Sequence, residues 1–240
     1  MPSIQPKKWK ETIDPLSLPT KQVKILEVLG YPYAANQVFY VRGEEESHEG
    51  YYFVKVAGYK DSNLANESQI LSTLHFPHIP SVAEKGDNFL ITRELKGQRL
   101  STIVQDNAHL ESMDYMAEFG KTLAELHAQK GDFPEAPHRH FHDLPDREKL
   151  EKSGLGFVFD YLEKNQPKET HRCFVHGDFH YANLLWENGH ISGILDFELA
   201  GIGDKEFDIA WSLILRPDQR FMKIKIHLFK GWFFAYAYKA

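Results

Sequence analysis

The chain has 240 residues, 42% of them hydrophobic and 26% charged, which is typical of a soluble globular protein with one large domain or two small lobes. It contains no apolar run of about 18 residues and no apolar N-terminal stretch of the signal-peptide kind, so we expect no membrane span and a cytoplasmic location. The formal net charge of −6, without a long cluster of Lys and Arg, argues against nucleic acid as a partner and is compatible with a cationic small molecule.

The single cysteine, Cys173, excludes an internal disulfide and suits a reducing compartment. Its neighbours Phe174 and Val175 are apolar, which favours a packing role for the thiol over that of a nucleophile. The sequence contains neither an internal repeat nor a low-complexity tract, so its elements have to be predicted one by one along the chain.

The first hundred residues are predicted to form mostly β-strands. Runs rich in β-branched and aromatic residues predict strands over residues 23–29, 37–42, 51–57, 81–84 and 88–95, with a charged turn over residues 43–50. One helix interrupts them, because Asp61-Ser62-Asn63 supplies candidate N-caps for a helix that continues to about Leu74.

From Lys96 onward the chain is predicted to be mainly helical. Apolar residues at helical spacing (Met116, Phe119, Leu123, Leu126) predict a long amphipathic helix over about residues 110–129. Further helices are predicted over residues 157–164, 204–215 and 218–238, with a loop over 132–145 and a strand at 174–175. Strands followed by helices indicate an α+β protein, with an N-terminal lobe over residues 1–95, a C-terminal lobe over 96–240 and a ligand in the cleft between them.

Residues 176–183 have the sequence H-G-D-F-H-Y-A-N, with the H-x-D-x-x-x-x-N spacing of a kinase catalytic loop. Asp196-Phe197-Glu198 follows thirteen residues after Asn183, where kinases have their metal-binding D-F-G. Phosphoryl transfer needs a carboxylate to orient the attacking hydroxyl and oxygen ligands that hold magnesium on the nucleotide phosphates. Each residue alone would be an ordinary turn or strand-end residue, but together they favour Asp178 for the first role and Asn183 and Asp196 for the second.

The Asn188-Gly189 pair predicts a tight hairpin between the catalytic loop and Asp196. If these two residues alone form the turn, Asn183 faces Ile194 across the hairpin and lies diagonal to Asp196. Such diagonal neighbours are about 7–8 Å apart, close enough to converge on one ion. A three-residue loop would instead place the two side chains on opposite faces.

Lys55 lies within the apolar run 53–57, and lysine is rarely buried without a partner. We interpret it as the strand lysine that binds the nucleotide phosphates, with Glu67 of the predicted helix as its partner; a snorkelling surface lysine is the alternative. Gly30 opens the segment 30–36, where a phosphate-binding loop is expected. That segment has only one glycine and is not G-x-G-x-x-G, so an ordinary hairpin turn remains the alternative.

Two further residues are candidates for supporting the site. His176 is expected to bond the backbone near Asp196, in preference to acting as a general base. Asp208 lies in a predicted helix whose apolar face would contain Phe207, Ala210, Trp211 and Ile214. The acids Asp204 and Glu206 at its start suit the helix dipole, whereas Asp208 could reach back and brace the catalytic loop. Three alternating histidines, His138, His140 and His142, with Asp143, suit a zinc site by type, but a solvated surface loop is favoured.

Residues 175–185, 194–198 and 203–210 together resemble the aminoglycoside phosphotransferase and choline-kinase-like family. The H-G-D form, in place of H-R-D, separates this pattern from protein kinases. The segment Leu123-Ala124-Glu125-Leu126-His127 also resembles the L-A-x-L-H at the end of the long helix of that family. The resemblance extends from about Lys21 to Trp211, and the block from H-G-D to D-F-E is its most specific part.

The resemblance implies a bilobal protein-kinase-like fold, with an N-terminal antiparallel sheet and one helix followed by a mainly helical lobe. It implies ATP or GTP as phosphoryl donor, Mg²⁺ as cofactor and a hydroxyl of a small molecule as acceptor, aminoglycoside antibiotics being one class. The roles it implies are catalytic base for Asp178, metal ligands for Asn183 and Asp196, nucleotide contacts for Lys55 and Glu67, and purine contacts from the backbone of Arg93-Glu94-Leu95-Lys96.

A non-catalytic nucleotide-binding pseudokinase is the alternative function. A protein kinase is disfavoured, because the chain has no A-P-E and only eleven residues separate Asp196 from Asp208. Relatives usually continue beyond the helix expected from Asp218 with helices that build the acceptor pocket, so we expect a reduced pocket or a shortened form. The sequence names neither the acceptor nor the oligomeric state.

Overall fold

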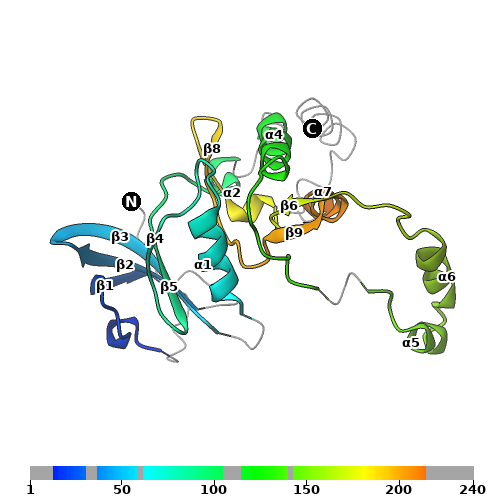
Figure 1. The fold of residues 1–240 in the computed structure, drawn as a ribbon, viewed down its shortest axis with the longest axis horizontal. Helices are drawn as coiled ribbons and strands as arrows, with labels where there is room; N and C mark the ends of the chain where they lie inside the picture. Colours follow the sequence, from blue (N-terminus) through cyan, green and yellow to red (C-terminus); the bar gives the residue numbers. More distant parts are fainter. Residues whose placement is uncertain (1–12, 31–36, 59–61, 105–114, 140–142, 215–240) are drawn as a thin grey trace.

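The computed structural model describes residues 13–30, 37–58, 62–104, 115–139 and 143–214. Figure 1 shows a β-sheet on one side and a mainly helical part on the other, with helix α1 (Leu64–Thr73) between them. This is the α+β arrangement that the order of strands and helices predicts. Among the described residues, no helix is both long and apolar enough to cross a membrane.

The sheet has five antiparallel strands in the order β1-β2-β3-β5-β4. Their bounds are β1 Val23–Gly30, β2 Gln37–Glu45, β3 His48–Val56, β4 Val82–Lys85 and β5 Phe89–Arg93, and a short 3₁₀ turn, η1 (Pro15–Ser17), precedes them. Alternate residues of β3, Val54 and Val56, are fully buried in the core of the sheet. Because side chains alternate along a strand, Lys55 points from the opposite face.

Helix α1 begins where the sequence predicts. The Asn63 side chain is its N-cap and accepts a hydrogen bond from the Asn66 backbone amide at 3.2 Å. The helix buries Ile70 and Leu71, and it also buries the polar side chains of Asn66 and Glu67. A helix with buried polar residues on its inner face is positioned by specific hydrogen bonds as well as by apolar packing.

The turn between β2 and β3 is shorter than the charged turn that the sequence predicts over residues 43–50. Strands β2 and β3 continue through this segment, and only Glu46 and Ser47 connect them. Both connecting residues have positive φ, 49° and 65°, as in the two-residue turns that match the twist of paired strands. The sequence lacks the Asn-Gly or Asp-Gly pair that normally predicts such a turn, and its run of charges is more typical of a longer loop.

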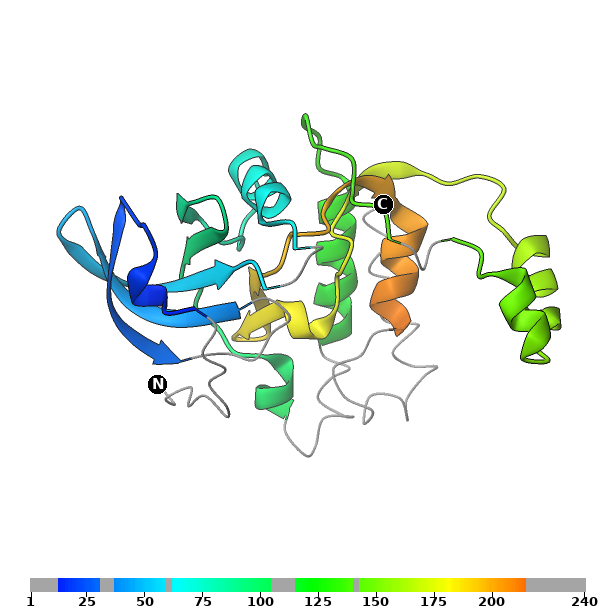
Figure 2. The same cartoon turned by 90° about the horizontal axis from the view of Figure 1, so that it is seen from below.

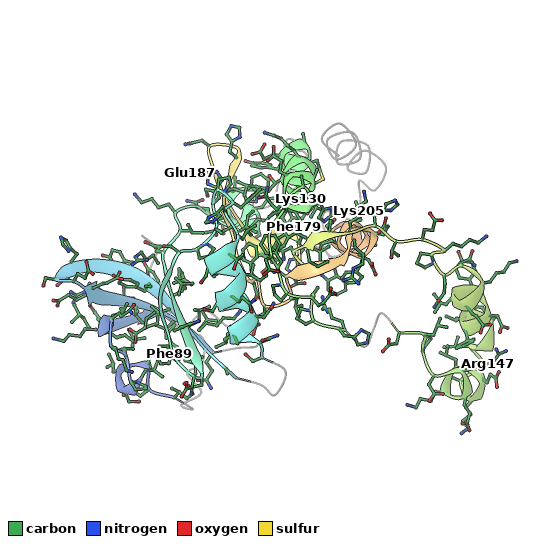
Figure 3. All side chains as sticks on the ribbon, viewed as in Figure 1. Phe89, Lys130, Arg147, Phe179, Glu187 and Lys205 are labelled. Atoms are coloured by element: carbon green, nitrogen blue, oxygen red, sulfur yellow. The ribbon has the colours of Figure 1, made fainter. Side chains whose placement is uncertain are left out.

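The second part of the chain contains two small antiparallel sheets, β6 with β9 and β7 with β8, together with several helices. The bounds are α2 Leu100–Val104, α4 Met116–His127, α5 Arg147–Lys152, α6 Gly156–Lys164, β6 Arg172–Val175, η5 Tyr181–Asn183, β7 Leu184–Glu187, β8 His190–Ile194, β9 Gly201–Asp204 and α7 Lys205–Ile214. The predicted apolar face of α4 is buried, and Phe119 packs against Phe179 with ring centroids 4.8 Å apart. Figure 3 shows Phe179 in the crowded interior of this part and Phe89 within the sheet.

Helices α5 and α6 stand apart from the rest of the molecule in both Figure 1 and Figure 2. They pack on each other, since Arg147 of α5 bonds Asp160 at 3.0 Å and lies 4.9 Å from the Phe159 ring centre. Helix α6 is predicted by its sequence, whereas α5 and α2 are not. The predicted start of the long helix near residue 110 and the predicted helix over 218–238 lie outside the described residues.

The segment that follows β5 is attached to the β7–β8 hairpin. The backbones of Gln98 and Trp186 exchange two hydrogen bonds, of 2.9 Å and 2.8 Å, and the Ser192 hydroxyl donates to the Lys96 carbonyl at 2.8 Å. Gly97 fits here because it has φ 132° and because a Cβ atom would lie 2.2 Å from the Ser192 hydroxyl. The connection between the two parts of the fold is therefore fixed to the hairpin that follows the H-G-D segment.

Candidate active site

The hairpin between the H-G-D segment and Asp196 has the predicted two-residue turn. Glu187 pairs with His190, and Asn188 and Gly189 have φ values of 51° and 82°. The predicted register beyond the turn is wrong, because a β-bulge follows between Leu185 and Trp186.

The bulge moves the pairing by one residue, so Leu184, and not Asn183, faces Ile194. Asn183 ends the 3₁₀ turn η5, and its carbonyl accepts a hydrogen bond from the Leu195 amide at 2.9 Å. The bulge lies where a third segment joins the hairpin, because Trp186 also pairs with Gln98 of the linker. Asn183 and the residue before Asp196 are thus in contact through the backbone.

Asp178 accepts hydrogen bonds on both carboxylate oxygens. The Trp211 indole N–H donates to Oδ1 at 2.6 Å, and the Asn183 side-chain amide donates to Oδ2 at 3.0 Å. The Nε2 atom of His180 lies 3.4 Å from the same Oδ2. The His180 Nδ1 atom accepts from the Ala182 amide at 3.1 Å, so the ring proton belongs on Nε2, where it faces the carboxylate.

This environment stabilises the charged form of Asp178. Partial burial alone would raise the pKa of the carboxyl, but the contacts from His180 and Trp211 outweigh it and lower the pKa to about 2. Asp178 is consequently ionised at neutral pH. A carboxylate of this kind holds and orients a hydroxyl well but is a weak base.

The side-chain amide of Asn183 has an NH₂ group and a carbonyl oxygen, and the neighbouring groups determine which way each of them points. Its Nδ2 atom lies 3.0 Å from both the backbone carbonyl and the Oδ2 atom of Asp178, which are acceptors and require the amide there. The carbonyl oxygen Oδ1 therefore points the other way. No residue in the described part of the chain donates a hydrogen bond to it.

Asp196 has an unusual backbone conformation, and it follows a residue, Leu195, whose backbone amide and carbonyl are both hydrogen-bonded. The Leu195 amide donates to Asn183, and its carbonyl accepts a 3.1 Å hydrogen bond from His176 Nε2. Asp196 itself has φ 68°, a left-handed value that costs energy for a residue with a side chain. Its side chain is 41% exposed, so a carboxylate oxygen remains accessible.

The donor set fits a hard divalent cation bound together with phosphates. The Oδ1 atom of Asn183 and the carboxylate of Asp196 are the kinds of oxygen that Mg²⁺ prefers, and Mg²⁺ usually takes only one or two protein ligands beside substrate phosphates. The described residues contain no group of three or more His, Cys, Asp or Glu side chains that could hold a metal without such help.

Lys55 contacts three carboxylates. Its ammonium lies 2.8 Å from Glu67 Oε2, 2.8 Å from Asp196 Oδ1 and 3.2 Å from Glu198 Oε2. Burial alone would lower the pKa of Lys55, but the three carboxylates outweigh it and raise the pKa. Lys55 is therefore charged, and the contact with Glu67 that the sequence predicts is present. The snorkelling alternative is wrong, because only 15% of the Lys55 side chain is exposed.

Glu198, the third carboxylate, also joins the D-F-E segment to the start of α1. Its side chain accepts hydrogen bonds from the Ser62 hydroxyl at 3.1 Å and the Asn63 amide at 2.9 Å. The Asn66 side-chain amide donates to the backbone carbonyls of Glu198 and Ala200, both at 2.9 Å. Helix α1, which carries Glu67, is consequently held against the segment that carries Asp196.

Asp208 braces the catalytic loop. Its side chain is fully buried and accepts hydrogen bonds from the backbone amides of His176 at 2.7 Å and Gly177 at 2.9 Å. The buried His127 Nε2, at the end of α4, lies 3.2 Å from the same carboxylate. These contacts replace the water that a buried carboxylate loses.

The predicted apolar face of α7 is therefore not the most buried one. Asp208 and Ser212 are buried, whereas Ala210, which was expected in the apolar face, is exposed. Hydrogen bonds from the catalytic loop explain why a polar face turns inward. Phe207 and Trp211 instead stack on each other at the edge of the site, with ring centroids 5.6 Å apart.

His176 is completely buried, and burial lowers the pKa of its imidazole. Its Nε2–H donates to the Leu195 carbonyl, while its Nδ1 accepts from the Asp178 amide at 3.3 Å. Both ring nitrogens are thus used by backbone groups on either side of the site. This is the bracing geometry expected of His176, and it leaves no ring nitrogen for a substrate.

The linker residues predicted to contact the purine have most of their groups occupied. The Arg93 amide donates to the Ser81 carbonyl and the Glu94 amide to the Tyr51 carbonyl, both at 3.0 Å. The Arg93 guanidinium bonds Glu45, and the Glu94 carboxylate accepts from the Tyr40 hydroxyl at 2.8 Å.

What remains of the linker for a ligand is the Glu94 carbonyl and the Leu95 backbone, to which no other described residue bonds. Gly30 is the last residue of β1 and pairs with Tyr40, but the segment 31–36 of the predicted phosphate loop lies outside the described residues. Of the histidine loop, His138 bonds Asp143 at 3.1 Å and both side chains are exposed, while His140 and His142 lie outside the described residues.

Four residues of the site are not singled out by the sequence: Arg139, His180, Glu198 and Trp211. Trp211 has a signal that could be used, since it lies three residues after Asp208 and such residues share a helix face. His180 and Glu198 belong to the recognised motifs, but the motifs alone predict no contacts for them. Arg139 lies in a loop, where sequence spacing predicts no partner.

The chain is similar to known phosphotransferases. The model of a family described as phosphotransferase enzyme family (APH) matches residues 34–238. A probable aminoglycoside 3′-phosphotransferase of Lactococcus lactis subsp. lactis (strain IL1403) is 23% identical over 207 residues, which cover 80% of this chain and 76% of the relative.

Two solved structures show the fold. The streptomycin–ATP–APH(2″)-IIa ternary complex is similar with a TM-score of 0.58 at 21% identity, over 91% of this chain and 82% of that chain. Choline kinase from Cryptosporidium parvum Iowa II is similar with a TM-score of 0.59 at 15% identity, over 91% and 72% of the two chains. The fold is therefore protein-kinase-like, and the chain, matched by the family model over most of its length, belongs to the APH phosphotransferase enzyme family.

Proposed function

We propose that this protein transfers the γ-phosphoryl group of ATP or GTP, with Mg²⁺, to a hydroxyl group of a small molecule. The observation that carries the proposal is one connected set of contacts. Asp178 bonds Asn183, Asn183 bonds the backbone next to Asp196, and Asp196 bonds Lys55. These are the residue types that phosphoryl transfer requires for the acceptor hydroxyl, the metal and the nucleotide.

Lys55 is the proposed contact of the nucleotide phosphates. It is charged, and Glu67 holds its ammonium from within helix α1. Glu67 has its second oxygen fixed by the Phe197 amide at 3.2 Å, so the Lys55–Glu67 pair is attached to the segment that carries Asp196. A lysine held in this way offers a fixed positive charge to a phosphate group.

Asn183 and Asp196 are the proposed ligands of Mg²⁺. The Oδ1 atom of Asn183 is directed away from Asp178, and the half-exposed carboxylate of Asp196 has one oxygen that is not bonded to Lys55. A bound Mg²⁺ would neutralise the negative charge that develops on the phosphate oxygens of the leaving group.

Asp178 is proposed to orient the acceptor hydroxyl. The hydroxyl oxygen forms a bond to the γ-phosphorus, the bond from that phosphorus to the bridging oxygen breaks, and the hydroxyl proton passes to Asp178. Since the pKa of Asp178 is lowered to about 2, the proton moves late, when the bond to phosphorus has made it acidic. This agrees with the loose transition state of phosphoryl transfer, in which little base strength is needed.

The acceptor is proposed to be a small polyhydroxylated and cationic molecule, with aminoglycosides as the first candidates. The similar protein of Lactococcus lactis is named a probable aminoglycoside 3′-phosphotransferase, and the similar APH(2″)-IIa complex contains streptomycin. Such molecules combine hydroxyl and ammonium groups, which suits a chain with a formal net charge of −6.

The test is an acceptor screen with the purified protein, Mg²⁺ and either ATP or GTP, covering aminoglycosides, amino alcohols, nucleosides and sugars. We expect transfer of labelled γ-phosphate to at least one class. Asp178→Ala should reduce kcat by about 10²–10⁴-fold with nucleotide Kd nearly unchanged. The matched control Asp160→Ala changes an exposed aspartate of α6 and should leave kcat unchanged.

Two outcomes would contradict the proposal. A nucleotide-dependent thermal shift without transfer to any acceptor would favour a non-catalytic nucleotide-binding protein. Equal losses of turnover and nucleotide affinity in Asp178→Ala would indicate that this residue maintains the structure of the loop and does not contact the acceptor.

A further inference from the structure

Trp211 makes a short contact with the proposed catalytic carboxylate. Its indole N–H donates to Asp178 Oδ1 at 2.6 Å, and only 21% of the Asp178 side chain is exposed. Trp211 lies on α7 three residues after Asp208, which bonds the backbone just before Asp178. One helix face therefore holds both the backbone of the catalytic loop and its functional side chain.

Trp211 is itself held on two sides. The Phe207 ring stacks on it at an interplanar angle of 28°, and the Arg139 guanidinium carbon lies 4.5 Å from its ring centroid, within the range of a cation–π contact. Arg139 also donates to the Gly177 carbonyl at 2.8 Å. The contacts form a closed circuit from the residue before Asp178, through Arg139 and Trp211, back to the Asp178 carboxylate.

This circuit restricts the rotation of the Asp178 carboxylate. Oδ1 is fixed by α7, and Oδ2 is fixed by Asn183 of the following turn, so the two oxygens are held by different elements. Each carboxylate oxygen can accept more than one hydrogen bond, so Asp178 retains the capacity to accept one from an acceptor hydroxyl. Transfer between oriented groups is sensitive to small errors in their placement.

We propose that Trp211, held in place by Arg139, is a positioning residue that sets the direction of the Asp178 carboxylate toward the acceptor hydroxyl; this rests on the function proposed above. Trp211 acts through Asp178 and takes no part in binding nucleotide. Its loss should lower kcat and leave the nucleotide KM unchanged.

The first test is kinetic. Trp211→Phe keeps an aromatic ring for Arg139 and Phe207 but removes the N–H donor, and we expect kcat to fall about 10- to 100-fold, as for the loss of a hydrogen bond to a charged group. The nucleotide KM should stay within about twofold. Arg139→Met should lower kcat by less, because it removes the cation–π contact to Trp211 and the hydrogen bond to Gly177 but leaves the indole N–H donor to Asp178 in place.

The matched control is Trp186→Phe. The Trp186 indole N–H is buried and has no hydrogen-bond partner among the described residues, so this change removes a ring from the core without removing such a bond. It should lower the melting temperature yet keep kcat near the wild-type value. Equal losses of kcat in the two variants, or a wild-type kcat in Trp211→Phe, would overturn the proposal.

The second test does not depend on activity. The sequence has four tryptophans, and the indole N–H signal that disappears from a ¹⁵N spectrum in Trp211→Phe identifies Trp211. Asp178→Ala should move that signal and leave in place the signal of Trp186, which the Trp186→Phe variant identifies in the same way. An unmoved signal would overturn the proposal by itself. If the wild-type protein phosphorylates no acceptor, the proposed function fails, whereas the indole signal still decides whether Trp211 holds Asp178.

Discussion

The ammonium of Lys55 is in direct contact with the carboxylate of Asp196, with Nζ and Oδ1 2.8 Å apart. In the proposed reaction these two groups have different partners, since Lys55 serves the phosphates and Asp196 the metal. Lys55 and the three carboxylates that it contacts, those of Glu67, Asp196 and Glu198, carry a formal charge of −2 by simple count (+1 and −3). A divalent cation would balance it, so metal and nucleotide are expected to enter together and replace this ion pair.

Removing the charge of Lys55 should destabilise the fold in a pH-dependent way. In Lys55→Met, Glu67 and Glu198 lose the counter-charge for side chains that are only 7% exposed, and we expect a loss of about 3–5 kcal/mol at neutral pH. Burial raises the pKa of Glu67 above that of the unfolded chain, and loss of the Lys55 charge, which opposes this shift, would raise it further. The contribution of Glu67 to stability is then present below about pH 4 and is lost as the pH rises through the raised pKa.

Urea unfolding at about pH 4.5 and about pH 7.5 measures this effect. The lower pH is close to the ordinary pKa of a glutamate, and the higher pH is well above it. The stability deficit of Lys55→Met relative to wild type should be clearly larger at the higher pH. Lys149→Met is the matched control, because the Lys149 side chain is 83% exposed and should show almost no deficit at either pH. A deficit of Lys55→Met that does not depend on pH would contradict the prediction.

Asp196→Ala should weaken nucleotide binding only when magnesium is present. The variant removes a proposed metal ligand but leaves the Lys55–Glu67 pair intact. Titration calorimetry should show Kd for Mg-nucleotide raised at least about tenfold, as for loss of one charged ligand, and Kd for metal-free nucleotide unchanged or lowered because Lys55 loses a competing carboxylate.

The control for that experiment is Asp160→Ala, an exposed aspartate on α6 that bonds Arg147. It should bind both forms of nucleotide like the wild type. Equal weakening of Mg-nucleotide and metal-free nucleotide by Asp196→Ala would show that Asp196 shapes the site and does not hold the metal.

Local patterns predicted the parts of the fold that depend on local physics. The N-cap at Asn63, the buried face of α4 and the two-residue turn at Asn188-Gly189 are all confirmed, because each depends on residues within a few positions of one another. The Lys55–Glu67 contact was predicted for another reason. A lysine that a strand buries needs an acidic partner, and Glu67 is the only acid between Asp61 and Glu84.

The parts that were wrong depend on contacts between distant segments. The bulge between Leu185 and Trp186 accompanies the pairing of Trp186 with Gln98, and no pattern within the hairpin indicates that the linker will add to it. The inward face of α7 is set by backbone amides of the catalytic loop that require Asp208. In both places a tertiary hydrogen bond outweighs the preference that the local sequence expresses.

Asp208 should be essential to the stability of the catalytic loop. Asp208→Ala leaves the amides of His176 and Gly177 buried without acceptors, and we expect a loss of about 3 kcal/mol or more in the free energy of unfolding. Asp208→Asn keeps one acceptor oxygen and should cost less. Asp204→Ala, an exposed aspartate just before α7, is the control and should stay within about 0.5 kcal/mol of wild type in urea unfolding. A stable Asp208→Ala would mean that the loop does not depend on this carboxylate.

Gly177, the central residue of H-G-D, should not tolerate a side chain. It has φ 77°, and a Cβ atom would lie 2.3 Å from the Leu199 carbonyl oxygen, a backbone atom that cannot move aside cheaply. Gly154 is a matched control with φ 71° and no atom within 4 Å of the place that a Cβ would occupy, so Gly154→Ala carries only the backbone cost of about 1–2 kcal/mol. Gly177→Ala adds the steric overlap and should cost at least about 2 kcal/mol more, measured by urea unfolding. Equal costs would show that the loop relaxes around the methyl group, and the close approach of Gly177 to Leu199 would then not be the reason for glycine at this position.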